Sequence, residues 1–87
     1  MKITLSKKFE KHFLRRIKTN QSLVKRFESR VVSFIQDPND PILRNHQLTG
    51  GKKEMYAFSI TGDIRVLYVI IGDEVWFVDI GTHNQVY

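Results

Sequence analysis

The sequence lacks cysteine and lacks any long apolar run. Without cysteine, the chain has no disulfide, no thiolate nucleophile and no cysteine-ligated zinc, which suits a reducing cytoplasm. The longest apolar run, residues 66–71, is too short to span a bilayer. Residues 1–8 lack the apolar segment of a signal peptide. These absences argue against a membrane protein or a secreted disulfide-rich protein, and we expect a cytoplasmic location without membrane contact.

The sequence also lacks the short motifs of several enzyme classes. It contains neither the G-x-x-x-x-G-K-[ST] loop of nucleotide-binding proteins nor the G-x-S-x-G turn of serine hydrolases. His12, His46 and His83 are scattered, with no H-x-x-x-H spacing that would indicate a metal site. We therefore expect neither a metal nor any other cofactor.

The length and the apolar content indicate one small folded domain. The chain has 87 residues, of which a third are Val, Ile, Leu or Phe. That fraction is too high for a disordered chain, while the length is too small for two independent cores. We predict a single domain over residues 1–87.

Charge is distributed unevenly along the chain. Residues 1–36 contain ten basic and two acidic residues, whereas residues 37–87 contain four basic and seven acidic residues. The two parts thus carry net charges of +8 and −3. Such asymmetry suggests a surface that faces a polyanion such as nucleic acid. The alternatives are solvated helix faces or a docking surface for an acidic protein.

The N-terminal part predicts one strand followed by two helices. Residues 1–5 alternate with a period of two, which is typical of a strand, and Ser6 is suited to capping a helix. Two stripes of apolar residues follow with helical spacing, separated by the polar residues 19–22. The first stripe is Phe9, Phe13, Leu14 and Ile17, and the second is Leu23, Phe27, Val31, Phe34 and Ile35. The short break predicts an antiparallel helical hairpin.

The C-terminal part predicts three strands. Pro38 and Pro41 end the second helix, and a loop continues to Gly50 and Gly51. Apolar segments at 55–60, 64–71 and 75–80 are separated by tight-turn sequences, which predicts an antiparallel meander with a polar tail. We expect the strand 64–71 to be central and the most buried. The predicted fold class is α+β, in the order β-α-α-β-β-β, with the helical hairpin packed on a small, mainly antiparallel sheet.

Arg65 is the clearest candidate for a functional residue. It is the only charged residue in the apolar strand 64–71, and an unpaired guanidinium is costly to bury, so it must pair or reach a surface. One alternative is an ion pair with Asp63 or Asp79. The functional alternative is a phosphate clamp, because a guanidinium stays charged and binds phosphate oxygens in a bidentate manner.

Two histidines and the final tyrosine are further candidates. His83 follows Gly81 at the end of the last strand, and His46 lies on the loop that enters the sheet. Histidine transfers protons near neutral pH. Tyr87 is either an apolar plug or a group that stacks on a base or transfers a proton. For His12, on the first helix, a purely structural role as a partly buried or surface side chain is the better interpretation.

Taken together, four segments resemble the bacterial RelE/ParE toxin superfamily, and within it the YafQ-like endoribonucleases. These segments are Leu48-Thr49-Gly50, Tyr56 to Ile60, Gly62 to Tyr68 and Ile80 to Tyr87. The D-x-R-x-x-Y strand and the terminal G-T-H-x-x-x-Y are the most specific of them. The two basic N-terminal helices also fit, so the resemblance covers nearly the whole chain.

The resemblance implies a microbial RNase-like fold and a toxin that cleaves mRNA, usually on the ribosome. It also implies a cognate antitoxin protein as partner. By position, Arg65 matches the arginine that contacts the scissile phosphate, and His46, Asp63, His83 and Tyr87 match the other catalytic positions of the YafQ-like branch. Cleavage would proceed by attack of a ribose 2′-hydroxyl on the adjacent phosphate, with no metal ion.

Basic side chains are expected to bind mRNA and ribosomal RNA. Lys52 and Lys53 fall where RelE places lysines near the RNA, and the remaining candidates lie on the basic first helix and in the loop. These remaining candidates are Lys7, Lys8, Lys11, Arg15 and Arg44.

Two rival functions remain open at this point. One is a ParE-like toxin that poisons DNA gyrase without cleaving RNA. The other is an inactive family member that acts as a binding protein. The retained histidines and the arginine favour the nuclease.

Overall fold

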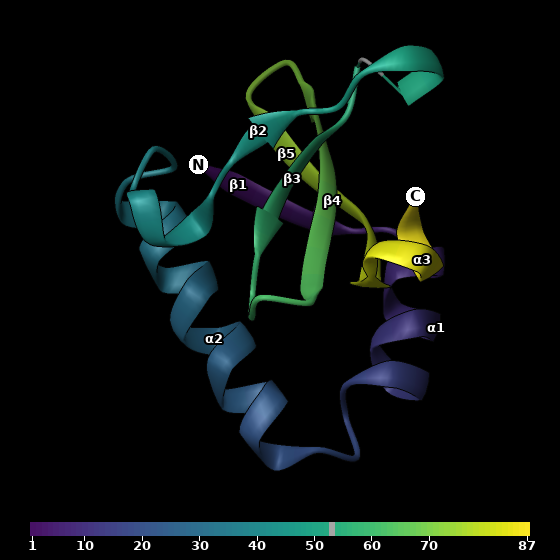
Figure 1. Cartoon of the computed structure of the whole chain (residues 1–87). Coiled ribbons are helices and arrows are strands. Elements are labelled where there is room, and N and C mark those ends of the chain that lie inside the picture. Colours follow the sequence, from purple (N-terminus) through teal and green to yellow (C-terminus); the bar gives the residue numbers. More distant parts are fainter. Residues whose placement is uncertain (53) are drawn as a thin grey trace.

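A five-stranded sheet forms the centre of the described part of the chain, which is residues 1–52 and 54–87 of a computed structural model. The order across the sheet is β1-β5-β4-β3-β2, with β1 parallel to β5 and the other neighbours antiparallel (Figure 1). The strands are β1 Lys2–Leu5, β2 His46–Gln47, β3 Tyr56–Ser59, β4 Ile64–Ile71 and β5 Glu74–Thr82. The helices are α1 Lys7–Arg16, α2 Gln21–Gln36 and α3 His83–Val86, with 3-10 turns η1 Pro41–Leu43 and η2 Gly50–Lys52. The predicted α+β fold is confirmed.

Ser6 starts α1, as the sequence predicted. Its hydroxyl accepts a hydrogen bond from the Phe9 amide at 3.0 Å, which satisfies one of the free amide groups at the helix start. The same hydroxyl donates to the Val78 carbonyl of β5 at 3.2 Å. The cap therefore also holds the start of α1 against the sheet.

Helix α1 covers the edge of β5 that β1 leaves free. The parallel pairing of β1 with β5 stops at Leu5 and Phe77. Beyond that point α1 packs along β5, and the Arg16 guanidinium donates to the Ile80 carbonyl at 2.8 Å. Arg16 of α1 thus satisfies a carbonyl group that would otherwise lie on an exposed sheet edge.

The two N-terminal helices form an open V rather than a closely packed antiparallel pair (Figure 1). They meet through the Phe13 and Phe27 rings, whose centroids are 5.0 Å apart. Two residues assigned to the inward stripes, Leu14 and Ile35, are instead 58% and 49% exposed, because the helices diverge and only a narrow stripe of each reaches the sheet. Within the described residues, no helix is both long and apolar enough to cross a membrane.

Aromatic side chains fill the space between the helices and the sheet. Phe34 of α2 stacks on Phe58 of β3 with centroids 4.7 Å apart, and it contacts Tyr68 of β4 edge-on at 5.0 Å. Phe9 of α1 lies 5.6 Å from Phe77 of β5. These buried contacts fix both helices on one face of the sheet and leave the other face for the C-terminal tail.

The segment before Gly50 is more ordered than the predicted loop. His46 pairs with Ala57 and Gln47 with Tyr56, so β2 adds a short strand to the edge of the sheet. Two residues give no periodic signal, and this strand forms only because β3 offers free hydrogen-bonding groups along its outer edge.

Strand β4 is central, as predicted, but it is not the most buried strand. Its end is exposed, since Ile70 and Ile71 are both 56% exposed. Strand β5 is longer than the predicted 75–80 and is buried over most of its length. The middle of the sheet is therefore shared between β4 and β5.

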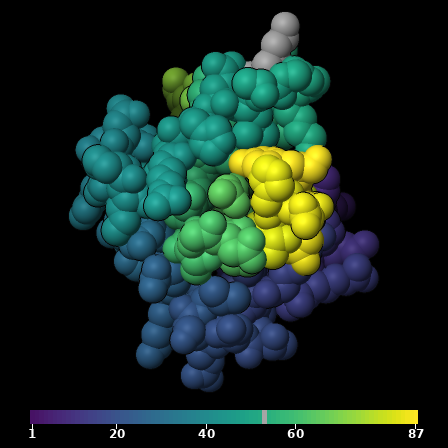
Figure 2. All heavy atoms as spheres, viewed as in Figure 1, coloured from purple at the N-terminus to yellow at the C-terminus, as the bar shows by residue number. Residues whose placement is uncertain are grey.

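The C-terminal tail does not simply leave the sheet. After β5 it forms the single turn of α3, and Val86 is buried against Leu48, Ala57 and Leu67 on the face opposite the helices. Figure 2 shows the tail in yellow beside the light green turn between β3 and β4. This packing places the end of the chain over the open face of the sheet.

A bulge in β5 decides which face its last residues occupy. Leu67 pairs with Asp79 and Tyr68 with Phe77, so β5 has one extra residue, Val78, at this point. Because strand side chains alternate between faces, the extra residue reverses the alternation beyond it. Asp79 thereby joins the face of Leu67 instead of the face of Phe77.

Candidate active site

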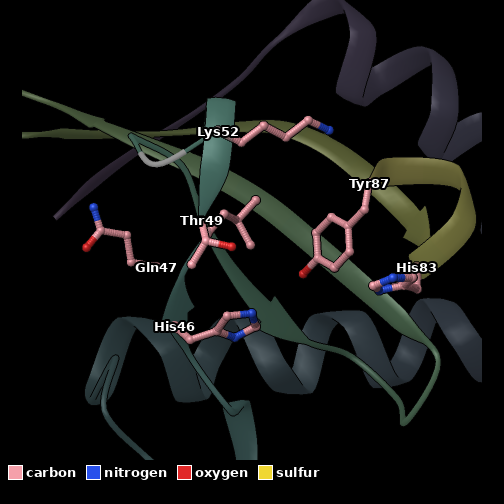
Figure 3. Close-up of a pocket in the computed structure, with 7 residues that line it drawn as sticks. His46, Gln47, Thr49, Lys52, His83 and Tyr87 are labelled. Atoms are coloured by element: carbon pink, nitrogen blue, oxygen red, sulfur yellow. The ribbon is translucent and has the colours of Figure 1, made fainter.

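An open cavity of about 360 Å³ lies on the face of the sheet opposite the two long helices. Its walls come from β2 and the residues after it, from η2 and from α3, which are far apart in sequence (Figure 3). The residues that line it are His46, Gln47, Leu48, Thr49, Lys52, His83 and Tyr87. Both histidines that the sequence singled out therefore line one cavity.

His46 is oriented by the chain just before it. Its Nδ1 lies 2.9 Å from the Arg44 carbonyl oxygen. A carbonyl oxygen only accepts hydrogen bonds, so Nδ1 carries the proton in this contact. In the neutral ring, Nε2 is then the unprotonated nitrogen and is able to accept a proton.

His83 and Tyr87 are held together by the single turn of α3. Their rings meet edge to face with centroids 4.4 Å apart. A reciprocal cap at the start of the turn fixes its geometry, because the Thr82 hydroxyl accepts from the Gln85 amide while the Gln85 side chain accepts from the Thr82 amide. The Tyr87 hydroxyl points across the cavity toward the His46 side (Figure 3).

Lys52 anchors the tail from the other side of the cavity. Its ammonium group donates to the Val86 carbonyl at 2.7 Å. The contact ties η2 to α3, and it occupies one of the three donors of the ammonium group. Lys52 thus has a structural contact, and its remaining donors stay available at the cavity.

Arg65 lies on the same face of the sheet as the tail. It pairs directly with Gly81 of β5, and side-chain alternation puts it on the face of Leu67. Its guanidinium donates to the Asp63 carbonyl at 3.3 Å. The alternative of an ion pair with the carboxylate of Asp63 or Asp79 is wrong, because no such pair forms among the described residues.

The positive charge of Arg65 affects the pKa of the Tyr87 phenol in the tail. Burial raises the pKa of Tyr87 above 10.0, and the positive charge of Arg65 opposes that rise. Arg65 itself does not line the cavity of the two histidines, but its positive charge acts on Tyr87, which does line it. The two imidazoles and the phenol therefore line one open cavity, and the guanidinium lies on the same face of the sheet.

This fold and this arrangement have counterparts among known proteins. A family model described as the bacterial toxin of a type II toxin–antitoxin system, YafQ, matches residues 1–87. The chain belongs to the YafQ family of bacterial toxins. No curated protein gives a significant match to the sequence of this toxin.

Solved structures of other toxins share the fold. A copper-bound mutant toxin from Helicobacter pylori is 25% identical to this chain, with a TM-score of 0.79 over 100% of this chain and 99% of that one. The YoeB/ParE toxin from Agrobacterium tumefaciens is 15% identical, with a TM-score of 0.80 over 95% and 99%. A chain of the E. coli DinJ-YafQ toxin–antitoxin complex is 18% identical, with a TM-score of 0.74 over 98% and 94%.

Several predicted site residues of this YafQ-family toxin lie outside the histidine cavity. Asp63 is exposed in the turn between β3 and β4, where its amide donates to the Thr61 hydroxyl. Arg44 lines a separate cavity next to α2. Lys53 lies outside the described residues. The exposed basic residues of α1 are Lys7, Lys8, Lys11 and Arg15.

The structural role predicted for His12 agrees with the structure, but its partner Asp79 was not predicted. Asp79 is 4% exposed, and its Oδ1 lies 2.6 Å from His12 Nδ1 and 3.5 Å from Arg16 Nη1. Lys8 approaches the other carboxylate oxygen at 3.7 Å. The sequence did offer one signal, because Asp79 is an acidic residue in an apolar strand. The strand by itself does not reveal that side chains of α1 surround this carboxylate.

Proposed function

We propose that this toxin is an endoribonuclease that cleaves mRNA on the ribosome without a metal ion. The observation that carries the proposal is that His46 and His83 line one open cavity, with Arg65 on the same sheet face. Two imidazoles and a guanidinium are the groups that phosphodiester transfer needs, namely a base, an acid and a fixed positive charge.

In the proposed reaction a ribose 2′-hydroxyl loses its proton and attacks the adjacent phosphorus. The new oxygen–phosphorus bond forms as the bond to the 5′-oxygen of the next nucleotide breaks. The products are a 2′,3′-cyclic phosphate and a 5′-hydroxyl, which takes up a proton as it leaves. DNA has no 2′-hydroxyl, so it is not a substrate.

The contact of His46 indicates which histidine acts as the base and which as the acid. We assign His46 as the base, because its Nδ1 donates to the Arg44 carbonyl and its Nε2 is then free to accept the 2′-hydroxyl proton. His83 then protonates the leaving oxygen. Arg65 stabilises the negative charge that develops on the phosphorus oxygens. Tyr87 positions a nucleotide, and Asp63 has at most an orienting role from its turn.

The family and its relatives support the remaining parts of the proposal. The matching family consists of toxins of type II toxin–antitoxin systems, and the E. coli relative is known in complex with DinJ. We infer that this toxin likewise has a cognate antitoxin protein. Its action on translated mRNA places it in the cytoplasm, where basic residues of α1 face ribosomal RNA.

Primer extension on a defined mRNA, translated by purified ribosomes, tests the proposal. Wild-type toxin should produce discrete cleavage sites, and Arg65→Ala should remove them. His83→Gln should slow cleavage by roughly 10²- to 10⁴-fold, the usual contribution of proton transfer. Lys25→Gln, on the exposed face of α2, is the control and should cleave normally.

Two results would contradict the proposal. Near-normal cleavage by His83→Gln would remove His83 from the mechanism. An mRNA that stays intact, together with inhibition of DNA supercoiling by gyrase, would instead support the ParE-like alternative.

A further inference from the structure

A second cavity, of about 200 Å³, is lined by three arginines. It lies between α2, the chain after η1 and the turn from β3 to β4. Arg26 and Arg30 lie on α2, and Arg44 directly follows η1. In Figure 2 the light green turn borders the teal segment that contains Arg44, on the same visible side as the yellow tail.

The three arginines are not neutralised by the protein. Among the described residues, none of the three guanidiniums has a carboxylate within 4.0 Å. The buried carboxylate of Asp79, by contrast, is surrounded by Lys8, His12 and Arg16. Arg26 and Arg44 are exposed and Arg30 is partly buried, and three guanidiniums without a carboxylate partner give this small cavity a positive potential that favours an anion.

The backbone at Arg44 is held in an unusual conformation. Arg44 is the only described residue other than glycine with a positive φ, at 49°. Left-handed backbone is disfavoured for any residue with a Cβ atom, and such positions occur often at binding sites. A glycine or asparagine would suit this turn better, so the arginine side chain itself is the feature that needs an explanation.

The turn from β3 to β4 adds a hydroxyl donor to the cavity. Thr61 lines it, and its Oγ1 already accepts hydrogen bonds from the amides of Asp63 and Ile64 at 3.1 and 3.0 Å. With its acceptor sites used in this way, the hydroxyl hydrogen is left to donate. Guanidiniums and a hydroxyl donor match the several oxygens of a phosphate group.

The arginine cavity adjoins the candidate active site. Ser59, which lines the cavity, pairs with Arg65 across β3 and β4, and residues paired in this way lie about 5 Å apart. On the other side, the Arg44 carbonyl holds His46. A bound RNA strand that places one phosphate at Arg65 would therefore bring a neighbouring phosphate to the arginine cavity.

We infer that Arg26, Arg30 and Arg44 form a subsite for a phosphate of the RNA backbone next to the phosphate that is cleaved. The inference rests on the proposed function. It adds a positioning site that holds the strand in register while the histidines act, and it makes no distinction between bases.

The test measures binding of a labelled 2′-O-methyl RNA oligonucleotide, which cannot be cleaved, by fluorescence anisotropy over a range of NaCl concentrations. The test variant carries Arg26→Gln, Arg30→Gln and Arg44→Gly. The glycine suits the positive φ, so the fold should be retained, and thermal unfolding checks this. The control variant carries Lys2→Gln, Lys18→Gln and Lys25→Gln, which remove the same charge elsewhere.

We expect the test variant to bind about 10- to 100-fold more weakly than wild type. The slope of log K against log salt should fall by about 0.7 for the one lost phosphate contact, whereas the control variant should keep the slope. In ¹⁵N NMR spectra, inorganic phosphate should shift the amide signals of Thr61 and Gly62 in wild type but not in the test variant.

The outcomes separate this inference from the proposed function. If wild type cleaves mRNA but the test variant keeps the RNA affinity and the salt slope of wild type, the phosphate subsite is contradicted. The proposed endoribonuclease activity is then still supported. If the salt slope of the test variant falls but wild type never cleaves RNA, the proposed endoribonuclease activity is contradicted. The inference that the arginines bind a backbone phosphate is then still supported. If the test variant loses affinity only for a glutamate-rich peptide, the cavity serves a protein and the inference is overturned.

Discussion

At the scale of single residues, Asp79 links α1 to the sheet. Its carboxylate is buried, and it accepts hydrogen bonds from the Ile80 amide at 2.8 Å and from His12. Removing one member of a buried charged group leaves the others without compensation, which costs more than losing an exposed ion pair. The pair of Lys2 and Glu74, at 3.7 Å, provides that comparison within the same protein, because the Lys2 side chain is 73% exposed.

We predict that Asp79→Ala lowers the free energy of unfolding by about 3 kcal/mol. Glu74→Gln should lower it by less than about 1 kcal/mol, because its partner stays in water. Urea unfolding curves of both variants test the difference. Equal losses in the two variants would show that the Asp79 cluster adds nothing to stability.

The phenol of Tyr87 provides a second prediction. Burial raises its pKa above 10.0, and the Arg65 charge opposes the rise. Arg65→Ala should therefore raise the pKa of Tyr87 further, which ultraviolet titration of the phenolate would detect. A pKa that falls in this variant would place Arg65 away from the tail.

The raised pKa of a buried tyrosine also affects the stability of the fold at high pH. Burial also raises the pKa of Tyr68 above 10.0. A group whose pKa is higher in the folded state contributes stability that is complete below its unfolded pKa and is lost as pH rises above it. The free energy of unfolding should thus decrease above pH 10, and a curve that stays flat there would contradict this.

At the scale of elements, α3 packs so closely on β5 that a side chain at position 81 would displace the ends of Gln85 and Arg16. A Cβ atom on Gly81 would lie 2.6 Å from Gln85 Oε1, 3.1 Å from Gln85 Cβ and 2.6 Å from Arg16 Nη1. Gln85 is half of the reciprocal cap that starts α3. The orientation of His83 and Tyr87 therefore depends on the absence of a side chain on the strand beneath them.

Gly81→Ala should disturb the cap and move the tail. We expect a loss of about 1 kcal/mol in unfolding free energy, typical of a lost cap. RNA cleavage should fall by about 10²-fold, because small displacements of catalytic groups are costly. Gly51→Ala is the matched control, since a Cβ atom there meets nothing within 4 Å. Full activity in Gly81→Ala would show that the tail position is not critical.

At the scale of the whole molecule, the basic charge gathers on the helices rather than around the histidine cavity. Lys7, Lys11 and Arg15 are exposed on α1, while Lys8 is within 3.7 Å of Asp79. A surface of this kind attracts RNA over a distance and is sensitive to salt. Under the proposed function, this surface would make the first encounter with the ribosome.

Neutralising Lys7, Lys11 and Arg15 to Gln should slow ribosome binding without changing the fold. Stopped-flow association at several NaCl concentrations would measure this. Wild type should associate much more slowly at high salt, and the variant should be both slower and less sensitive to salt. Association rates that do not depend on salt would contradict a role for α1 in the encounter.

Elements with local signals could be predicted from the order of the amino acids. Ser6 marks the start of α1, helical spacing of phenylalanines predicts α1 and α2, and strand β4 was predicted at its observed bounds, residues 64–71. Arg65 stood out as a candidate site residue because one charge interrupts an apolar strand, and its role stays a prediction. The predictions of the elements succeed because capping and periodicity depend on neighbouring residues alone.

Which side chains meet depends on contacts between segments that are far apart in the chain. Strand β2, which carries His46, exists because β3 has a free edge. The bulge at Val78 puts Asp79 on the face of Arg65, and the packing of α2 against η1 brings Arg26 and Arg30 to Arg44. Register, bulges and edge pairing join residues distant in sequence, so the periodicity of one segment carries no information about them.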